Sequence, residues 1–124
     1  MKNKIYDCIT FYNENLQVKL RLNILNDYVD KFVICESIYD HKGKKKNLNF
    51  KIEEFKQFKD KIIYLTIKDE PKGILDTSNP ESSAYIKRLN SLKRIEQSYD
   101  YMMNGINEAS DEDLIILNDN DEIP

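Results

Sequence analysis

Two carboxylates, Asp119 and Asp121, stand one residue apart near the end of the sequence. They follow residues 114–117, a continuous apolar run that predicts a buried, parallel strand covered on both faces. In an open α/β sheet, ligands bind beyond the carboxyl ends of the strands. Repulsion between neighbouring carboxylates is relieved by a hard divalent cation, which prefers oxygen ligands. The spacing therefore suggests that Asp119 and Asp121 bind Mg²⁺ or Mn²⁺, with water and substrate phosphate completing the coordination shell.

The acidic segment after residue 117 also has other interpretations, which are a solvated turn, an EF-hand loop and a phosphatase site. Asp and Asn form turns readily, so an acidic tripeptide after a strand is also typical of a solvated turn. An EF-hand loop needs a glycine at its sixth position and a glutamate at its twelfth, and the residues after Asp119 supply neither. A phosphatase with Asp119 as its nucleophile would need further groups downstream, and the sequence holds none there.

The composition indicates one globular domain. The chain has 124 residues, of which 40% are hydrophobic and 33% charged, and its net charge is −3. This charge gives no general reason to expect binding to nucleic acid or to an anionic membrane. No apolar run is long enough for a transmembrane helix, and the first residues carry no signal-peptide pattern. Cys8 and Cys35 fall in predicted strands as buried thiols, so we expect a cytoplasmic protein.

The apolar pattern predicts alternating strands and helices. Strands are expected over residues 5–12, 32–36, 62–67 and 114–117. Residues 16–25 fit both the two-residue period of a strand and the spacing of a helix. We prefer a helix, capped by Asn13 or Asn15, because two parallel strands need a crossover connection between them.

Two further helices complete the pattern. One is expected over residues 51–60, with Phe55 and Phe58 pointing inward, and a long one over residues 84–104, ending at Asn104-Gly105. The apolar residues of the long helix at helical spacing are Ile86, Leu89, Leu92, Ile95, Tyr99, Met102 and Met103. Residues 68–83 are expected to form a long irregular connection.

The polar loop over residues 37–50 carries His41 and four lysines, which are Lys42, Lys44, Lys45 and Lys46. Such a cluster is usually a solvated surface. The functional alternative is a grip on phosphate or on an acidic substrate, with lysine acting as a point charge. His41 by itself supports no catalytic role.

The element order predicts an α/β fold with a Rossmann-like, mostly parallel sheet. The three glycines are Gly43, Gly73 and Gly105, and none directly follows the first strand. The glycine-rich pyrophosphate fingerprint and the P-loop are therefore both absent, which argues against an NAD or FAD site of the usual kind. A nucleotide bound here would have its diphosphate neutralised by a metal.

Several of these segments, in order, resemble glycosyltransferase family 17, the family of the β-1,4-mannosyl-glycoprotein N-acetylglucosaminyltransferase. The similar segments are residues 5–14, Arg21-Leu22-Asn23, residues 29–37, the loop residues His41, Gly43, Lys44, Lys46, Leu48 and Phe50, and residues 118–124. The last of these, Asn118-Asp119-Asn120-Asp121-Glu122-Ile123-Pro124, is similar to the family motif Ser-Asp-x-Asp-Glu-Ile-Pro.

The resemblance implies a GT-A fold, a UDP-sugar donor such as UDP-N-acetylglucosamine, and an inverting transfer. Residues 1–124 would form one incomplete domain, the N-terminal donor-binding half. Asp121 would bind the metal directly, and Asp119 would contact the ribose or reach the metal through water.

Further donor contacts are implied at the strand ends and on the long helix. Phe11, Tyr12 and Asn13 would meet the uracil or ribose, and Glu36 would accept hydrogen bonds from uridine. Arg88 and Arg94 could face the phosphates. The alternatives are strand-end packing for the first group, an exposed strand-end acid for Glu36, and helix-surface charge for the arginines.

The resemblance also implies what should be missing. The family carries a Gln-Arg pair on the long helix, whereas Gln97 is followed here by Ser98, with Arg94 upstream. The acceptor site, for a glycan or another hydroxyl compound, and the catalytic base would lie downstream, so no base is assigned. We expect self-association or a missing C-terminal half, because an unfinished sheet leaves an open edge. A binding module without turnover, and a metal-dependent phosphate-ester enzyme using Asp119, remain alternative functions.

Overall fold

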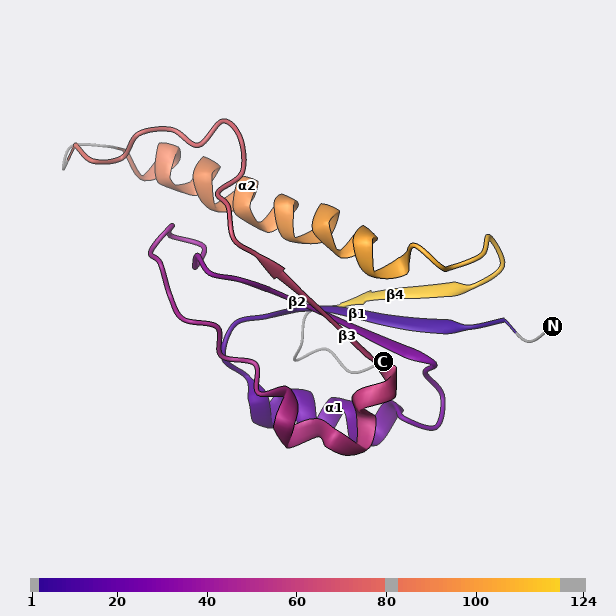
Figure 1. The fold of residues 1–124 in the computed structure, drawn as a ribbon. Helices are drawn as coiled ribbons and strands as arrows, with labels where there is room; N and C mark the ends of the chain where they lie inside the picture. Colours follow the sequence, from indigo (N-terminus) through magenta and orange to yellow (C-terminus); the bar gives the residue numbers. More distant parts are fainter. Residues whose placement is uncertain (1–2, 80–82, 119–124) are drawn as a thin grey trace.

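The structure, a computed structural model, describes residues 3–79 and 83–118, which form an α/β fold with three layers (Figure 1). Its strands are β1 (Ile5–Phe11), β2 (Lys31–Ser37), β3 (Ile62–Ile67) and β4 (Leu114–Asn118). Its helices are α1 (Asn15–Leu25), the 3-10 segment η1 (Ile52–Lys61), α2 (Ala84–Met102) and the 3-10 turn η2 (Met103–Ile106). The predicted α/β fold with a Rossmann-like parallel sheet is confirmed.

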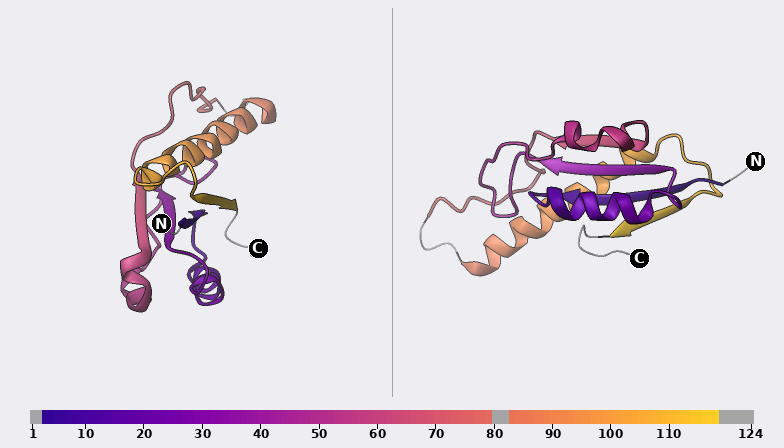
Figure 2. Two further views of the ribbon diagram at one scale, coloured as in Figure 1. Left: turned by 90° about the vertical axis from the view of Figure 1, so that its right-hand side faces the viewer. Right: turned by 90° about the horizontal axis from the view of Figure 1, so that it is seen from below.

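The four strands form one sheet in the order β3-β2-β1-β4, and each neighbouring pair is parallel. Strands β2 and β3 are added in turn on one side of β1, and β4 is then added on the other side of β1. Because crossovers between parallel strands are right-handed, this reversal puts α2 on the opposite face from α1 and η1 (Figures 1 and 2). The strand order therefore reverses between β1 and β4, which is the usual ligand position in open α/β sheets.

The core has one apolar layer on each face of the sheet, because successive side chains of a strand point to opposite faces. On β1, Ile9 and Phe11 belong to the layer between the sheet and α1 with η1, while Tyr6 and Cys8 belong to the layer between the sheet and α2. The inward positions predicted for Phe55 and Phe58 are confirmed, since both are buried.

Helix α1 confirms the helical interpretation of residues 16–25. Val18, Leu22 and Leu25 are buried, whereas Leu16, Leu20 and Ile24 are exposed, Leu16 by 82%. The two-residue alternation thus arises from a helix that is apolar on two sides. The predicted cap was wrong: Glu14 occupies the N-cap position, and its side chain makes no capping bond to the helix.

A buried ion pair joins α1 to β1. The Arg21 guanidinium donates from Nε to Oδ2 of Asp7 at 2.6 Å and from Nη2 to Oδ1 at 2.7 Å, and both side chains are almost fully buried. This two-pronged geometry fixes both the distance and the orientation of the two groups. It therefore sets how α1 lies on the first strand.

The end of the long helix differs from the prediction. Helix α2 ends at Met102 and continues into η2, which contains Gly105 with a non-positive φ, so this glycine is not a left-handed helix stop. Gly105 is buried instead, and a Cβ added there would lie 2.5 Å from Cγ1 of Val33 on β2. The glycine is needed because the turn approaches the sheet so closely. Two of the apolar residues that recur at helical spacing, Leu92 and Met103, are exposed.

We expect Gly105→Ala to lower the free energy of unfolding by about 1–3 kcal/mol, because the added methyl overpacks the contact with Val33. Urea unfolding measures the change. The double variant Gly105→Ala/Val33→Ala removes the colliding methyl groups, so its loss should be smaller than the sum of the two single losses. Strictly additive losses would contradict this explanation.

Strand β4 corrects the prediction of a strand covered on both faces. Within the described ranges it is an edge strand that pairs only with β1, and Leu114 and Leu117 are 56% and 44% exposed. The continuous apolar run therefore predicts the strand correctly here but does not predict its position at the edge of the sheet. Self-association through this edge, or its covering by another segment, stays a prediction. No helix in the described part of the chain is long and apolar enough to cross a membrane.

Candidate functional site

A cleft of about 340 Å³ opens at the carboxyl ends of β1 and β2, next to the middle of α2. Its lining residues are Thr10, Phe11, Tyr12, Glu14, Cys35, Ser37, Tyr39, Asp40, His41, Lys46, Arg94 and Ser98. This is the edge where ligands bind in parallel sheets. The sequence predicted the position from the strand ends, and Tyr12, Phe11 and Arg94 are the predicted site residues that line it.

Tyr12 and Lys46 form the aromatic and cationic part of the cleft. Tyr12 is half-exposed, and Nζ of Lys46 lies 5.3 Å from the centre of its ring. The Tyr12 backbone is held on both sides, because its N–H donates to the Glu14 carboxylate at 3.0 Å and its carbonyl accepts from Asn49 Nδ2 at 2.8 Å. The ring is therefore presented on a fixed backbone at the end of β1.

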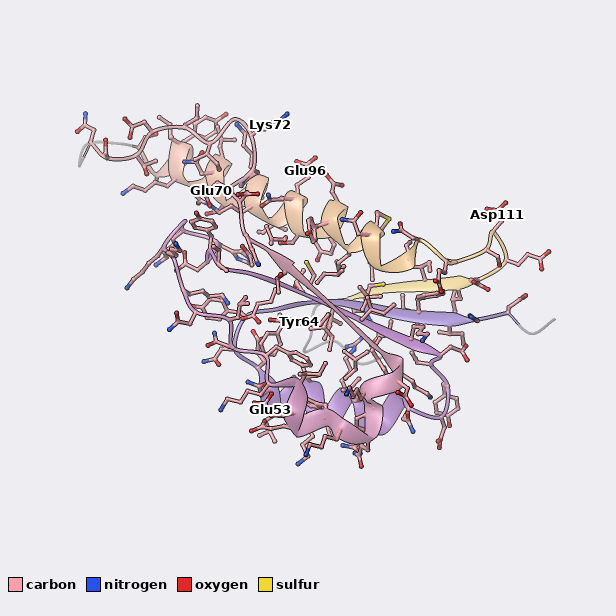
Figure 3. The ribbon with its side chains drawn as sticks, viewed as in Figure 1. Glu53, Tyr64, Glu70, Lys72, Glu96 and Asp111 are labelled. Carbon is pink, nitrogen blue, oxygen red and sulfur yellow. The ribbon has the colours of Figure 1, made fainter. Side chains whose placement is uncertain are left out.

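Glu36 lies beneath this pair and is fully buried. Its carboxylate accepts hydrogen bonds from Lys46 Nζ and the Asn49 N–H, each at 2.6 Å, from the Phe50 N–H at 3.1 Å and from the Tyr64 hydroxyl at 2.6 Å (Tyr64 is labelled in Figure 3). Burial, followed by this bond, raises the pKa of the Tyr64 hydroxyl. Glu36 is thus neither exposed nor a lining residue of the cleft; it anchors the loop that carries Lys46.

Arg94 lies at the other wall of the cleft and holds two loops against α2. Its guanidinium forms an ion pair with Glu70 at 2.7 Å, and Nη1 donates to the carbonyl of His41 at 2.9 Å (Figure 3 labels Glu70). Gly43 has a φ of +88° and packs against the guanidinium so closely that a Cβ would collide with it. The Arg94 side chain therefore positions the turn that forms one side of the cleft.

Among the predicted site residues, Phe11 reaches the cleft from the core, whereas Asn13 and Arg88 do not line it. The ring of Phe11 packs edge-on against Phe50 in the core, at 5.4 Å between centroids. Asn13 is exposed, and its N–H donates to the Glu14 carboxylate. Arg88 lines a different cleft, nearer the start of α2.

The predicted metal ligands, Asp119 and Asp121, lie outside the described residues. The last described residue, Asn118, pairs with Ile9 on β1, the strand whose end lines the cleft. Residues 3–79 and 83–118 contain no cluster of His, Cys, Asp or Glu suited to a metal ion. Asp119 and Asp121 carry the oxygen ligands that Mg²⁺ and Mn²⁺ prefer, so the metal site after β4 stays a prediction.

Cys35 lines the cleft without the properties of a nucleophile. Burial, with a smaller contribution from the charge of Glu36, raises the pKa of its thiol to about 12. The thiolate is the reactive form of cysteine, so the thiol stays protonated and unreactive near neutral pH.

Several lining residues could not have been singled out from the sequence. Ser37 is the last residue of β2 and Tyr39 lies two residues beyond it, so their place at the strand end was the available signal for them. Of the four clustered lysines, Lys46 lines the cleft and the other three are exposed, and the phosphate-binding role considered for the cluster stays a prediction. The cleft combines an aromatic ring, two ion-paired cations, two acids and hydroxyl groups, and the ring with the hydroxyl groups suits a ligand that has a planar base and a sugar.

Comparison with known protein families gives a match to glycosyltransferase family 17 that spans residues 1–124. No curated protein and no solved structure matches the chain.

Proposed function

Because the chain belongs to glycosyltransferase family 17, and so to a family of glycosyl-transfer enzymes, we propose that its cleft binds the UDP part of a UDP-sugar donor. The observation that supports this most directly is the Tyr12–Lys46 pair at the carboxyl end of β1, beside the point where the strand order reverses. An aromatic face accepts a base by stacking, and a lysine ammonium attracts phosphate as a point charge.

In this proposal the Tyr12 ring stacks on the uracil, and the Lys46 ammonium faces the donor's negative charge. The Lys46 side chain is only 12% exposed and is held by Glu36. Its position therefore does not depend on the ligand, and little side-chain entropy is lost when the donor binds. Ser37 and Ser98 line the same cleft; Ser37 Oγ accepts from the Tyr39 N–H and can still donate, and Ser98 Oγ donates to the Arg94 carbonyl and can still accept, so each can bond once more to the ribose or the sugar.

Asp119 and Asp121 are the proposed ligands of Mg²⁺ or Mn²⁺, since the sequence places them directly after β4, the strand next to β1. The metal would supply Lewis-acid stabilisation of the diphosphate leaving group. In an inverting transfer, the acceptor hydroxyl attacks the anomeric carbon from the face opposite UDP, and UDP departs with the bonding electrons. We assign the UDP-N-acetylglucosamine donor and the inverting outcome by family resemblance and assign no residue as the base.

Thermal unfolding with UDP, with and without Mn²⁺, tests the proposal. UDP at about 100 times its dissociation constant should stabilise the chain by roughly 2.7 kcal/mol, which raises Tm by several degrees for a domain of this size. We expect Asp121→Asn to abolish the part of the shift that depends on Mn²⁺, and Tyr12→Ala to reduce the shift with and without metal.

The matched control is Tyr28→Ala, which removes a tyrosine that is 71% exposed and lies outside the cleft. It should leave the UDP shift unchanged. An equal UDP shift in the Tyr12 and Tyr28 variants would refute the proposed donor site. Binding of UDP without release of UDP from UDP-N-acetylglucosamine would favour the alternative, a nucleotide-binding module that does not turn over its ligand.

A further inference from the structure

A second cleft, of about 470 Å³, lies between the first half of α2, the turn around Lys42 and the segment around Thr77. Four of its lining side chains are cationic, namely Lys42, Lys87, Arg88 and Arg94, and the described lining residues include no acid. We call it the cationic cleft. Arg88 was expected at the donor phosphates, so its place here needs a separate explanation.

The walls of the cationic cleft are tied firmly to α2. Asn90 is buried, and its side-chain amide accepts from the Leu75 N–H at 2.9 Å and donates to the Leu75 carbonyl at 2.8 Å. The Ser91 hydroxyl donates to the His41 carbonyl at 2.8 Å, next to the bond from Arg94. Three segments that are distant in the sequence are thus joined by specific hydrogen bonds, so the cleft is part of the folded architecture.

Within the described residues, three of the four cations of this cleft have no ion-pair partner. The charge of Arg94 is balanced by Glu70. By contrast, none of Lys42, Lys87 and Arg88 forms an ion pair with another residue in the ranges 3–79 and 83–118. Like charges around a concave surface repel one another and attract a counter-ion into it. An anionic group is therefore the ligand that fits this site.

One face of α2 connects the two clefts. Lys87, Ser91, Arg94 and Ser98 recur at helical spacing and lie on the same side of the helix. The first three line the cationic cleft, the last two line the donor cleft, and Arg94 borders both. Eleven residues separate Lys87 from Ser98, which corresponds to roughly 16 Å along a helix. An elongated molecule could therefore reach from one cleft to the other.

We propose that the cationic cleft binds a phosphate or carboxylate group of the acceptor, which makes the acceptor an anionic glycan. This inference rests on the proposed function, because it takes the first cleft as the donor site. Lys87 and Arg88 hold the anionic group, while the acceptor hydroxyl reaches the donor along the same face of α2. Both are substrate-positioning residues and take no part in the chemistry.

Calorimetric titration with inorganic phosphate and with glucuronate, at constant ionic strength set by NaCl, tests the site. We expect saturable binding to the wild-type chain, weakened about tenfold or more in the double variant Lys87→Glu/Arg88→Glu, because two charge-assisted contacts are lost. The matched control is Lys19→Glu/Lys56→Glu, which makes the same change in net charge at exposed positions outside the cleft. It should bind both anions as the wild type does.

The UDP thermal shift separates this proposal from the previous one. Lys87→Glu/Arg88→Glu should keep that shift, and a retained shift also shows that the variant is folded. We expect it to fold because acidic residues near a helix N-terminus stabilise the helix. If phosphate binding is lost in this variant while the Tyr12-dependent UDP shift is retained, both proposals are supported. If wild-type UDP binding is absent but anion binding depends on Lys87 and Arg88, the anion site stands and its role in holding an acceptor is overturned.

Three further results would overturn the inference. The first is the absence of saturable phosphate or glucuronate binding, and the second is equal binding in the two double variants. The third comes from vesicles: binding to phosphatidylglycerol vesicles and not to phosphatidylcholine vesicles, without binding of either free anion, would assign the cationic cleft to a membrane surface in place of a glycan.

Discussion

Arg21→Met should lower the free energy of unfolding by about 3–5 kcal/mol, because it leaves the buried Asp7 carboxylate without its partner. Asp7 and Arg21 are 1% and 0% exposed in their side chains, so water cannot replace the lost hydrogen bonds without opening the contact between α1 and β1. Methionine has a similar length and helix propensity, which limits other sources of destabilisation. A domain is typically stable by only 5–15 kcal/mol, so this loss is a large fraction of the total.

Urea unfolding at 25 °C, followed by circular dichroism, measures this change. The informative control is Asp7→Leu/Arg21→Met, which removes both charges and leaves apolar side chains. Replacing a whole buried ion pair by apolar residues is often close to neutral, so the double variant should be more stable than Arg21→Met alone. If the double variant is less stable than the single one, the uncompensated charge is not the cause.

Glu36→Gln should lower the free energy of unfolding by about 3 kcal/mol and weaken UDP binding. The Glu36 carboxylate accepts from four donors, and a glutamine offers one acceptor oxygen and an amide that faces donors. Hydrogen bonds to charged groups contribute roughly 1.5–3 kcal/mol, and buried donors left without acceptors add to the loss. The released loop carries Lys46, so its ammonium should no longer be held over the Tyr12 ring.

The control for this change is Tyr64→Phe, which removes only the hydroxyl donor to Glu36 and leaves the other three donors in place. We expect a loss of about 1.5 kcal/mol, the low end of the range for one hydrogen bond to a charged group, and unchanged UDP binding, because Tyr64 does not line the donor cleft. Urea unfolding and UDP titration of both variants measure the two effects. Normal UDP affinity in a folded Glu36→Gln variant would show that this carboxylate does not position Lys46 for the ligand.

The strands could be predicted from the sequence because their apolar runs are short and rich in β-branched residues. The local sequence pattern could not predict whether the side chains of each apolar run are buried in the folded chain. Leu114 and Leu117 were predicted to be buried but are exposed on an edge strand. Leu16 and Leu20 read as part of one apolar face but lie on the outer side of α1. Exposure depends on which elements pack against a side chain, and this is settled by the whole chain.

The sequence by itself determined the order of elements, the parallel sheet, the edge at which the cleft opens, and the resemblance to a glycosyltransferase family. Only the tertiary structure decided which polar side chains meet there. It placed Lys46 beside Tyr12, buried Glu36 beneath them, and put Arg94 at the border of both clefts but Arg88 at the cationic cleft alone. The physical reason is that local periodicity records whether a side chain faces a core, whereas its partners come from distant segments that meet only when the helices pack on the sheet.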